Sequence, residues 1–325
     1  MREFSPSRRS FLLGSLGMAV AGCVAPSVRT AREEVAEFPL IDVHSHYVPA
    51  SAVRHGYTPE QLLRAMDVAG IRRMVVLGSG PEVPALPRRH PARFVASYVF
   101  RSFRFRQERG EIKDGTAPEE AERLGAEFEA ALRSGLYRGL GEIHTYARPI
   151  PGAITGGSAI PGSNIAPDSS LIRRLVELAG RNDVPINIHC DDYGVGQMVR
   201  TLGAYPKSRV IWAHAGSALS PSAMREILRD HPNVSFDLSA KNPACCPLGA
   251  ATYPIVGFRT IDEAWRELFE AHPDRFYVGV DFFSSEHLRG AREAGEFYRT
   301  ILTQLTPAAA RRIGYQNAQE AYRLS

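Results

Sequence analysis

The same order of residues recurs four times along this chain and limits what it can fold into. Residues 89–98, 204–214, 230–238 and 271–281 read RHPARFVASY, AYPKSRVIWAH, DHPNVSFDL and AHPDRFYVGVD. In each, a helix-like stretch ends at His or Tyr, a proline follows, and a run of β-branched or aromatic residues begins. Because proline stops a helix and favours extended backbone in the residue before it, each segment predicts a helix-to-strand connection. Four such connections imply repeated βα units.

Apolar runs extend the count to eight strands that alternate with helices. We expect the strands near residues 39–44, 71–78, 93–100, 138–144, 185–190, 209–215, 233–238 and 276–281. The count favours an α/β fold of the (β/α)8 TIM-barrel type, about 300 residues long after removal of a leader. An open doubly wound sheet is the alternative, because periodicity does not reveal whether a sheet closes.

Two of the intervening helices have clear sequence signals. Over residues 118–134, apolar side chains repeat every four positions, which is typical of an amphipathic helix. Over residues 169–180, Asp168 is a candidate N-cap and Gly180 a candidate stop.

The first 22 residues have the features of an export signal. Arg8 and Arg9 precede an apolar run from Phe11 to Ala21, about half the length of the roughly 20 residues that span a bilayer. Paired arginines of this kind fit the twin-arginine route, and VAGC, ending at Cys23, resembles a bacterial lipobox that leaves a lipidated cysteine. We expect a signal over 1–22, a tether over 23–37 and one domain over 38–325, in a periplasmic or membrane-anchored lipoprotein. A basic disordered N-terminus, or ordinary cleavage near Ala25, is the alternative.

The charge of the chain limits the kinds of partner that it can bind. The formal net charge is +4, with acidic and basic residues mixed throughout, so nothing argues for nucleic acid. We expect a small-molecule substrate, and membrane contact only through the N-terminal lipid anchor. Barrel enzymes often form homo-oligomers, but no surface in the sequence identifies the contact.

Beyond Cys23 the chain has Cys190, Cys245 and Cys246, an odd number that leaves at least one thiol free. A bond between the adjacent pair would be strained.

Polar residues stand where the predicted strands end. In a barrel these carboxyl ends form the active face, so their side chains meet there. His44 and His46, one residue apart, face the same way along the first strand. Imidazole and carboxylate are ligands for Zn²⁺ and similar ions. The strand-end residues are His44, His46, Glu142, His144, His189, His214, Asp237 and Asp281.

Five motifs in this order resemble the amidohydrolase superfamily, in particular its amidohydrolase-related branch. They are DVHSHYVP from residue 42, GEIH, HCD, AHAG and GVDF, and the C-terminal IGYQNAQEAY is also similar. The resemblance implies one or two divalent ions, for which we expect Zn²⁺. It places His44, His46 and Asp281 on one ion, His189 and His214 on a second, and Glu142 as the bridge, where many members use a lysine carbamate. Asp42 and Asp237 are expected to support these ligands rather than to join them.

The implied reaction is hydrolysis of an amide, a lactone or another ester by metal-activated water, with Asp281 carrying the proton. A non-oxidative decarboxylase of aromatic or muconate-type acids is one alternative, and a non-catalytic surface lipoprotein that binds a metal or ligand is another. Long loops after the third, fourth and seventh strands are expected to set the substrate. Arg101 and Arg148 in these loops suit a substrate carboxylate, and His144 is a further candidate for substrate contact.

Overall fold

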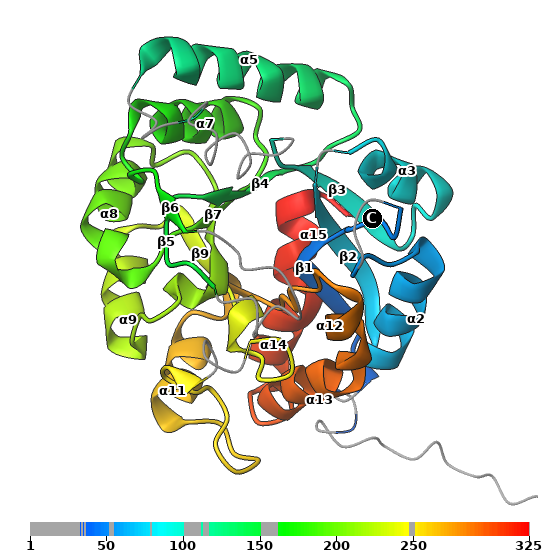
Figure 1. Ribbon diagram of the computed structural model, residues 1–325. Helices are drawn as coiled ribbons and strands as arrows, with labels where there is room; N and C mark the ends of the chain where they lie inside the picture. The colour runs from blue at the N-terminus through cyan, green and yellow to red at the C-terminus, as the bar shows by residue number, and fades with distance from the viewer. Residues whose placement is uncertain are drawn as a thin grey trace, which may run out of the picture.

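A ring of eight parallel strands forms the centre of the molecule (Figure 1). The computed structural model describes residues 33, 35, 37–51, 55–78, 80–100, 112, 117–150, 162–246 and 251–324. In these ranges the strands follow one another around the ring as β1 (Leu40–His46), β2 (Ile71–Gly78), β3 (Phe94–Tyr98), β4 (Leu140–His144), β7 (Ile186–His189), β8 (Val210–Trp212), β9 (Val234–Asp237) and β10 (Phe276–Tyr277).

The segment that follows β10 closes the ring against β1. The backbone N–H of Val43 donates to the carbonyl of Val278 at 2.9 Å, and that of Asp281 donates to the carbonyl of His44 at 2.7 Å. Because β1 also pairs with β2 on its other side, it has partners along both edges. The predicted TIM barrel is therefore confirmed, and the open doubly wound sheet is excluded.

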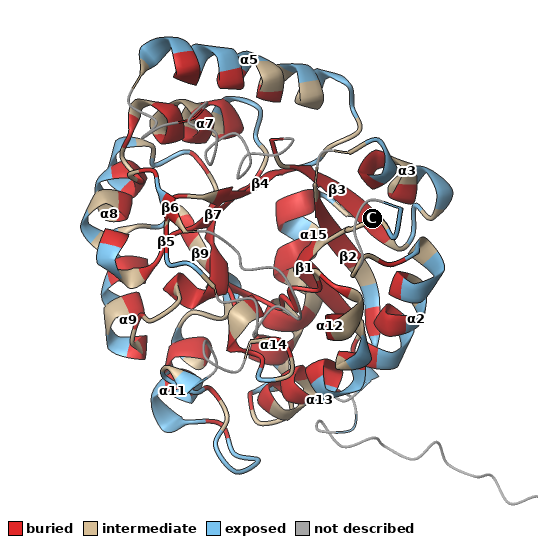
Figure 2. Ribbon diagram, in the orientation of Figure 1, coloured by how far each residue is buried: buried red, intermediate tan, exposed pale blue. Residues whose placement is uncertain are grey.

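Most of the helices surround the strands, and Figure 2 shows these outer helices with red sides toward the strands and pale blue sides facing outward. Among the described residues, none of them has both the length and the hydropathy to cross a membrane. The helices are α2 (Pro59–Ala69), α3 (Glu82–Arg89), α5 (Pro118–Arg133), α7 (Ser170–Arg181), α8 (Val195–Ala204), α9 (Pro221–Asp230), α11 (Glu263–Ala271), α12 (Ser285–Arg289), α13 (Ala291–Leu302), α14 (Pro307–Arg311) and α15 (Asn317–Tyr322).

Of the two helices predicted in detail, α5 is confirmed and the caps of α7 are corrected. Ser169, not Asp168, is the N-cap of α7, and its hydroxyl accepts the N–H of Ile172. Asp168 instead binds the guanidinium of Arg200 at 2.9 Å. The helix also continues past Gly180, where a side chain would collide with Ser208; this glycine allows close packing and does not stop the helix.

The interior of the barrel is apolar at the amino ends of its strands. Side chains from β1, β2, β3, β8 and β10 pack there against Ala318, Ala321 and Tyr322 of α15, the red helix seen within the ring in Figure 1. This helix closes the amino end of the barrel. The interior space at the carboxyl ends is left to polar residues, and the candidate site lies there.

Candidate metal centre

Five histidines and two carboxylates converge at the carboxyl ends of the strands. In three overlapping groups, one potential ligand atom from each residue lies within 4.8 Å of the others. The groups are His44, His46 and Asp281; His44, Glu142 and His214; and Glu142, His144 and His189. The structure thus brings together all six residues predicted as metal ligands, and it adds His144.

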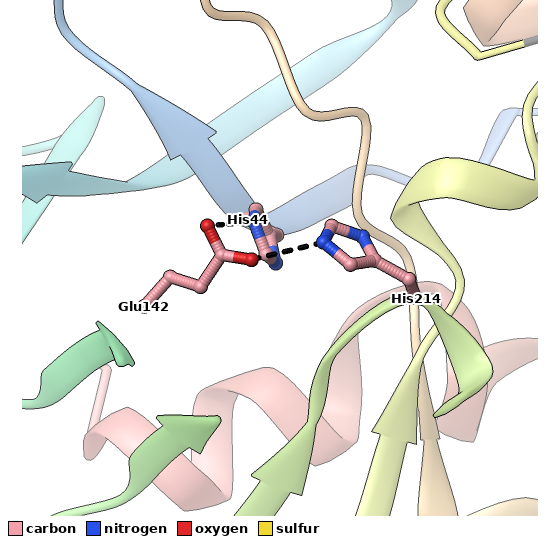
Figure 3. Close-up of side chains that lie close together, drawn as sticks. All are labelled: His44, Glu142 and His214. Atoms are coloured by element: carbon pink, nitrogen blue, oxygen red, sulfur yellow. Dashed lines mark hydrogen bonds and ion pairs between the residues drawn. The ribbon is translucent and has the colours of Figure 1, made fainter. Parts of the chain in front are cut away.

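Glu142 lies at the middle of this arrangement. Its Oε1 atom is 2.9 Å from both His189 Nδ1 and His214 Nε2. Its Oε2 atom is 3.4 Å from His46 Nε2 and 3.6 Å from His44 Nε2. Figure 3 shows the carboxylate beside the rings of His44 and His214, with a different oxygen directed at each. One oxygen therefore faces each of the two predicted ligand sets.

His144 belongs to the same cluster and does not stand at its rim. Its Nε2 atom is 3.0 Å from Glu142 Oε2, and its ring stacks on that of His189 with centroids 4.8 Å apart. The structure thus places His144 among the candidate ligands, closer to the metal chemistry than a substrate contact alone requires.

The inward direction of Glu142 depends on an irregularity at Gly141. The pairing of β4 with β7 shifts register between Leu140 and Ile143, which both pack outside the barrel against the helices. Gly141 has φ +106°, and a Cβ atom there would lie 2.1 Å from the carbonyl oxygen of Asn187. Only glycine fits this position. Regular alternation would have turned Glu142 to the side of Leu140, away from the site.

The His44 ring is held from one side and unpartnered on the other. Its Nδ1 atom lies 3.0 Å from Asp237 Oδ2, and both side chains are fully buried. Its Nε2 atom is buried and has no hydrogen-bond partner among the described residues; the carboxylate oxygens of Glu142 and Asp281 lie 3.6 and 3.8 Å away. With the Nδ1 proton donated to Asp237, the Nε2 lone pair faces Glu142 and Asp281, as in metal-binding histidines. A buried nitrogen left in this way costs about 1–3 kcal/mol, which a cation at this point would offset.

His189 and His214 are oriented in the same manner. His214 Nδ1 lies 2.6 Å from the Ser239 hydroxyl, which donates in turn to Asp237 Oδ1 at 2.5 Å. His189 Nε2 lies 3.2 Å from Asp191 Oδ1, so its Nδ1 atom is the one that faces Glu142. Sequence reasoning assigned no role to Asp191 or Ser239. Asp191 is nevertheless the aspartate of the HCD motif, whereas the only signal for Ser239 was its place two residues beyond Asp237.

Asp42 and Asp237 both support the site, by different contacts. Asp237 also accepts the side-chain amide of Asn187 at 2.8 Å, so it positions the His44 ring as expected. Asp42 does not touch that ring. It accepts the backbone N–H groups of His44 at 2.9 Å and Val280 at 3.0 Å, and so joins β1 to the closing segment.

His214 and Asp281 lie just beyond the strands that were predicted to contain them. Strand β8 ends at Trp212 and β10 ends at Tyr277, so the runs predicted over 209–215 and 276–281 were too long. His214 has φ 58° and Asp281 has φ 56°. This left-handed conformation is uncommon outside glycine and concentrates at functional sites. Both residues thus stand at sharp turns over the barrel mouth.

Buried carboxylates and histidines in the cluster shift one another's pKa values. Burial favours the neutral form of Glu142, but His144 and His44 hold the pKa of this carboxyl well below its usual range. Although burial opposes it, Asp237 and Glu142 raise the pKa of His44. Likewise burial lowers the pKa of His189, whereas Asp191 and Glu142 raise it, to about 9. The carboxylates therefore stabilise positive charge at the centre, whether imidazolium or a cation carries it.

The remaining predicted residues lie at the rim or outside the described ranges. The Arg148 guanidinium is 2.6 Å from Asp192 and 3.5 Å from Asp191, and it lies over the Tyr193 ring. A substrate carboxylate would have to compete with these two aspartates. Arg101 and Cys23 lie outside the described residues.

The sequence profile of the amidohydrolase family matches residues 41–324. No curated protein matches the chain. Solved structures that match it share the fold at low sequence identity. A probable 2-pyrone-4,6-dicarboxylic acid hydrolase from Acinetobacter baumannii, with citric acid bound, has a TM-score of 0.54 and 13% identity, covering 88% of this chain and 100% of that one.

Two further solved structures extend the range of chemistry found on this fold. A 2,6-dihydroxybenzoate decarboxylase in complex with 2,6-dihydroxybenzoate has a TM-score of 0.54 and 12% identity, with 88% and 99% coverage. An amidohydrolase from Burkholderia multivorans with bound zinc has a TM-score of 0.53 and 16% identity, with 89% and 100% coverage.

Proposed function

Since the chain belongs to the amidohydrolase family, we propose that it is a metal-dependent hydrolase of an amide, lactone or other ester bond in a small substrate. The observation that carries the proposal is the buried, unpartnered Nε2 atom of His44. It faces two carboxylates within 3.6 to 3.8 Å, and its other nitrogen is fixed by Asp237. This donor set fits a divalent cation better than it fits a hydrogen-bonded core.

In this proposal His44, His46 and Asp281 would hold one ion, His189 and His214 would hold a second, and Glu142 is close enough to both sets to serve either ion. Nitrogen and carboxylate oxygen are the usual ligands of Zn²⁺, which the Burkholderia structure contains. When bound, such an ion supplies Lewis acidity and makes hydroxide available near neutral pH.

Asp281 is the proposed proton carrier. Its Oδ1 atom lies 3.5 Å from His46 Nε2 and 3.8 Å from His44 Nε2, and its side chain is 9% exposed. A carboxylate in this position accepts a proton from the attacking water and returns it to the leaving group. The His46 side chain is 25% exposed whereas that of His44 is fully buried. The substrate therefore approaches from the His46 side.

A decarboxylase of an aromatic acid is the second candidate, favoured by the likeness to the 2,6-dihydroxybenzoate enzyme. The contacts of Glu142 distinguish the hydrolase from the decarboxylase. A glutamate within reach of both ligand sets supports a two-ion hydrolase, whereas a single ion together with carbon dioxide release would indicate the lyase.

The test begins with protein purified without chelators, in which bound metal is counted by mass spectrometry. The protein is then assayed against amides, lactones, esters and aromatic carboxylic acids. We expect close to two ions, hydrolysis, and a loss of at least ~100-fold in kcat for Asp281→Asn. Asp274→Asn, at an exposed aspartate, is the matched control. Full activity of Asp281→Asn would overturn the proton role, and metal-free protein with full activity would overturn the proposal.

We also propose export and lipidation at Cys23, on the sequence evidence alone. A full-length chain expressed in a bacterial host should be recovered with the membrane fraction and labelled by palmitate. Cys23→Ala should abolish the label. Recovery of an unprocessed chain from the cytoplasm would contradict the proposed export signal.

A further inference from the structure

Cys245 and Cys246 form an adjacent pair of thiols that the proposed mechanism does not use. Both lie in the turn after β9, and both backbone N–H groups donate to the carbonyl of Asn242, at 3.2 and 2.9 Å. The two sulfur atoms are 2.7 Å apart, closer than an ordinary contact between separate thiols. Cys245 is buried and Cys246 is partly exposed. The side chains are therefore directed at one another, and one of them is open to reagents.

This pair also touches the candidate metal centre. The Cys245 thiol donates to the backbone carbonyl of Asp281 at 3.5 Å. A carboxylate oxygen of Asp281 and the two sulfurs all lie within 4.8 Å of one another. Asp281 is also held in a left-handed backbone conformation, so its position depends on such neighbours. A bond between the sulfurs would alter the support of Asp281.

We propose that Cys245 and Cys246 are a site of reversible oxidation, at which a small-molecule disulfide converts the dithiol into a vicinal disulfide. The exposed Cys246 thiolate attacks one sulfur of the reagent, and the first reagent thiol leaves. The Cys245 thiolate then attacks Cys246 Sγ, and the second reagent thiol leaves. The protein loses two electrons and two protons, which the two released thiols carry.

The product is easily reduced, because consecutive Cα atoms are about 3.8 Å apart. Ordinary disulfides join Cα atoms roughly 4.4–6.8 Å apart, and a bond outside that range is strained and more oxidising. Oxidation also removes the S–H donor of Cys245 from the Asp281 carbonyl. This second consequence rests on the proposed function of Asp281, and it predicts weaker metal retention and slower hydrolysis in the oxidised protein.

The experiment treats metal-loaded protein with glutathione disulfide, quenches with acid, alkylates free thiols and maps the peptides by mass spectrometry. The wild type should lose two hydrogen atoms across residues 245–246 and regain them with dithiothreitol. Cys245→Ser should stop at a mixed disulfide on Cys246, because the second thiol is missing. Cys246→Ser should stay unmodified at Cys245, because that thiol is buried. Cys190→Ala should behave as the wild type.

Equal modification of Cys245 and Cys246 in the two single variants would overturn the assigned order of attack. Alkylation of both thiols in the treated wild type, under conditions that modify Cys245→Ser, would overturn the disulfide itself. The peptide map needs no catalytic activity, so it tests the oxidation independently of the hydrolase proposal. Unchanged metal content after complete oxidation would overturn the link to Asp281.

Discussion

The Nδ1 atom of His44 lies 3.0 Å from the Oδ2 atom of Asp237, beneath the candidate metal centre. The same carboxylate accepts the backbone N–H of His214 at 3.1 Å and the hydroxyl of Ser239 at 2.5 Å. One buried carboxylate therefore orients ligands of both predicted ions. Although burial opposes it, the charge of His44 holds the pKa of Asp237 well below its usual range.

Asp237→Asn tests this relationship. The amide keeps the shape of the side chain but removes the charge, so the Nδ1 proton of His44 loses its strong acceptor. Metal affinity should fall roughly 10- to 100-fold, as for other partners of ligand histidines. The measurement is competition with a chromogenic chelator, and Asp274→Asn is the control on an exposed aspartate. Unchanged affinity would mean that Asp237 serves only the packing of the barrel.

Asp191→Asn should affect one ion and spare the other. Asp191 binds His189 Nε2 at 3.2 Å and the backbone N–H of Arg148 at 2.7 Å, but no described contact joins it to His44 or His46. At limiting free metal we expect the variant to retain one ion where the wild type retains two. The neighbouring Asp192 binds Arg148 and not His189, so Asp192→Asn is the matched control. Loss of both ions together would contradict two separate ligand sets.

Removal of the metal should lower thermal stability. An ion that binds only the folded chain, at a free concentration 100 times its Kd, stabilises it by about 2.7 kcal/mol, which corresponds to a rise in Tm of roughly 4–5 °C for a domain of this size. Dialysis against a chelator, followed by Zn²⁺, should lower and then restore Tm in calorimetry. Glu142→Gln should lose most of this response, because its oxygen lies 2.9 Å from both His189 and His214. Identical Tm values with and without chelator would count against a resident ion.

The barrel was predictable because its signals are local. Proline between a helix and an apolar run marks a βα connection wherever it occurs, and all eight strands appeared where the runs lie. The strand count favoured a closed barrel but left an open sheet as the alternative, since closure depends on hydrogen bonds such as that from Val43 to Val278, which join the first strand to the segment after the last. The N-cap of α7 was missed because Asp168 and Ser169 are both good caps; in the structure Ser169 caps the helix and Asp168 contacts Arg200.

The candidate ligands were predictable from their position at strand ends, but their orientation was not. Glu142 faces the site through the irregular backbone at Gly141, which a two-residue period does not anticipate. The partners that fix the imidazoles come from different places: Asp237 on β9 fixes His44 of β1, and Asp191, just beyond β7, fixes His189 of the same strand. Ser239 thus reaches His214 from a segment distant in the sequence, and only the assembled barrel reveals it.

Lys241 is a buried cation in the turn after β9. It is 1% exposed, and its Nζ atom donates to the carbonyls of Ser217 and Thr252 at 2.7 Å each. It thereby ties the turn after β9 to the turn after β8. Burial lowers the pKa of this ammonium group from its ordinary 10.5 to about 8.

Lys241→Met should therefore change how stability depends on pH. Between about pH 8 and pH 10.5, Lys241 is protonated in the unfolded chain but largely neutral in the folded chain. The contribution of Lys241 to the free energy of unfolding therefore rises with pH in that window and is lost as pH falls toward 8. The free energy of unfolding of the wild type minus that of Lys241→Met should rise by at most about 1.4 kcal/mol per pH unit there. Urea unfolding at several pH values measures it. Lys207→Met, at an exposed lysine, should show no such slope; a flat difference for Lys241→Met would mean that its carbonyl partners keep the ammonium form.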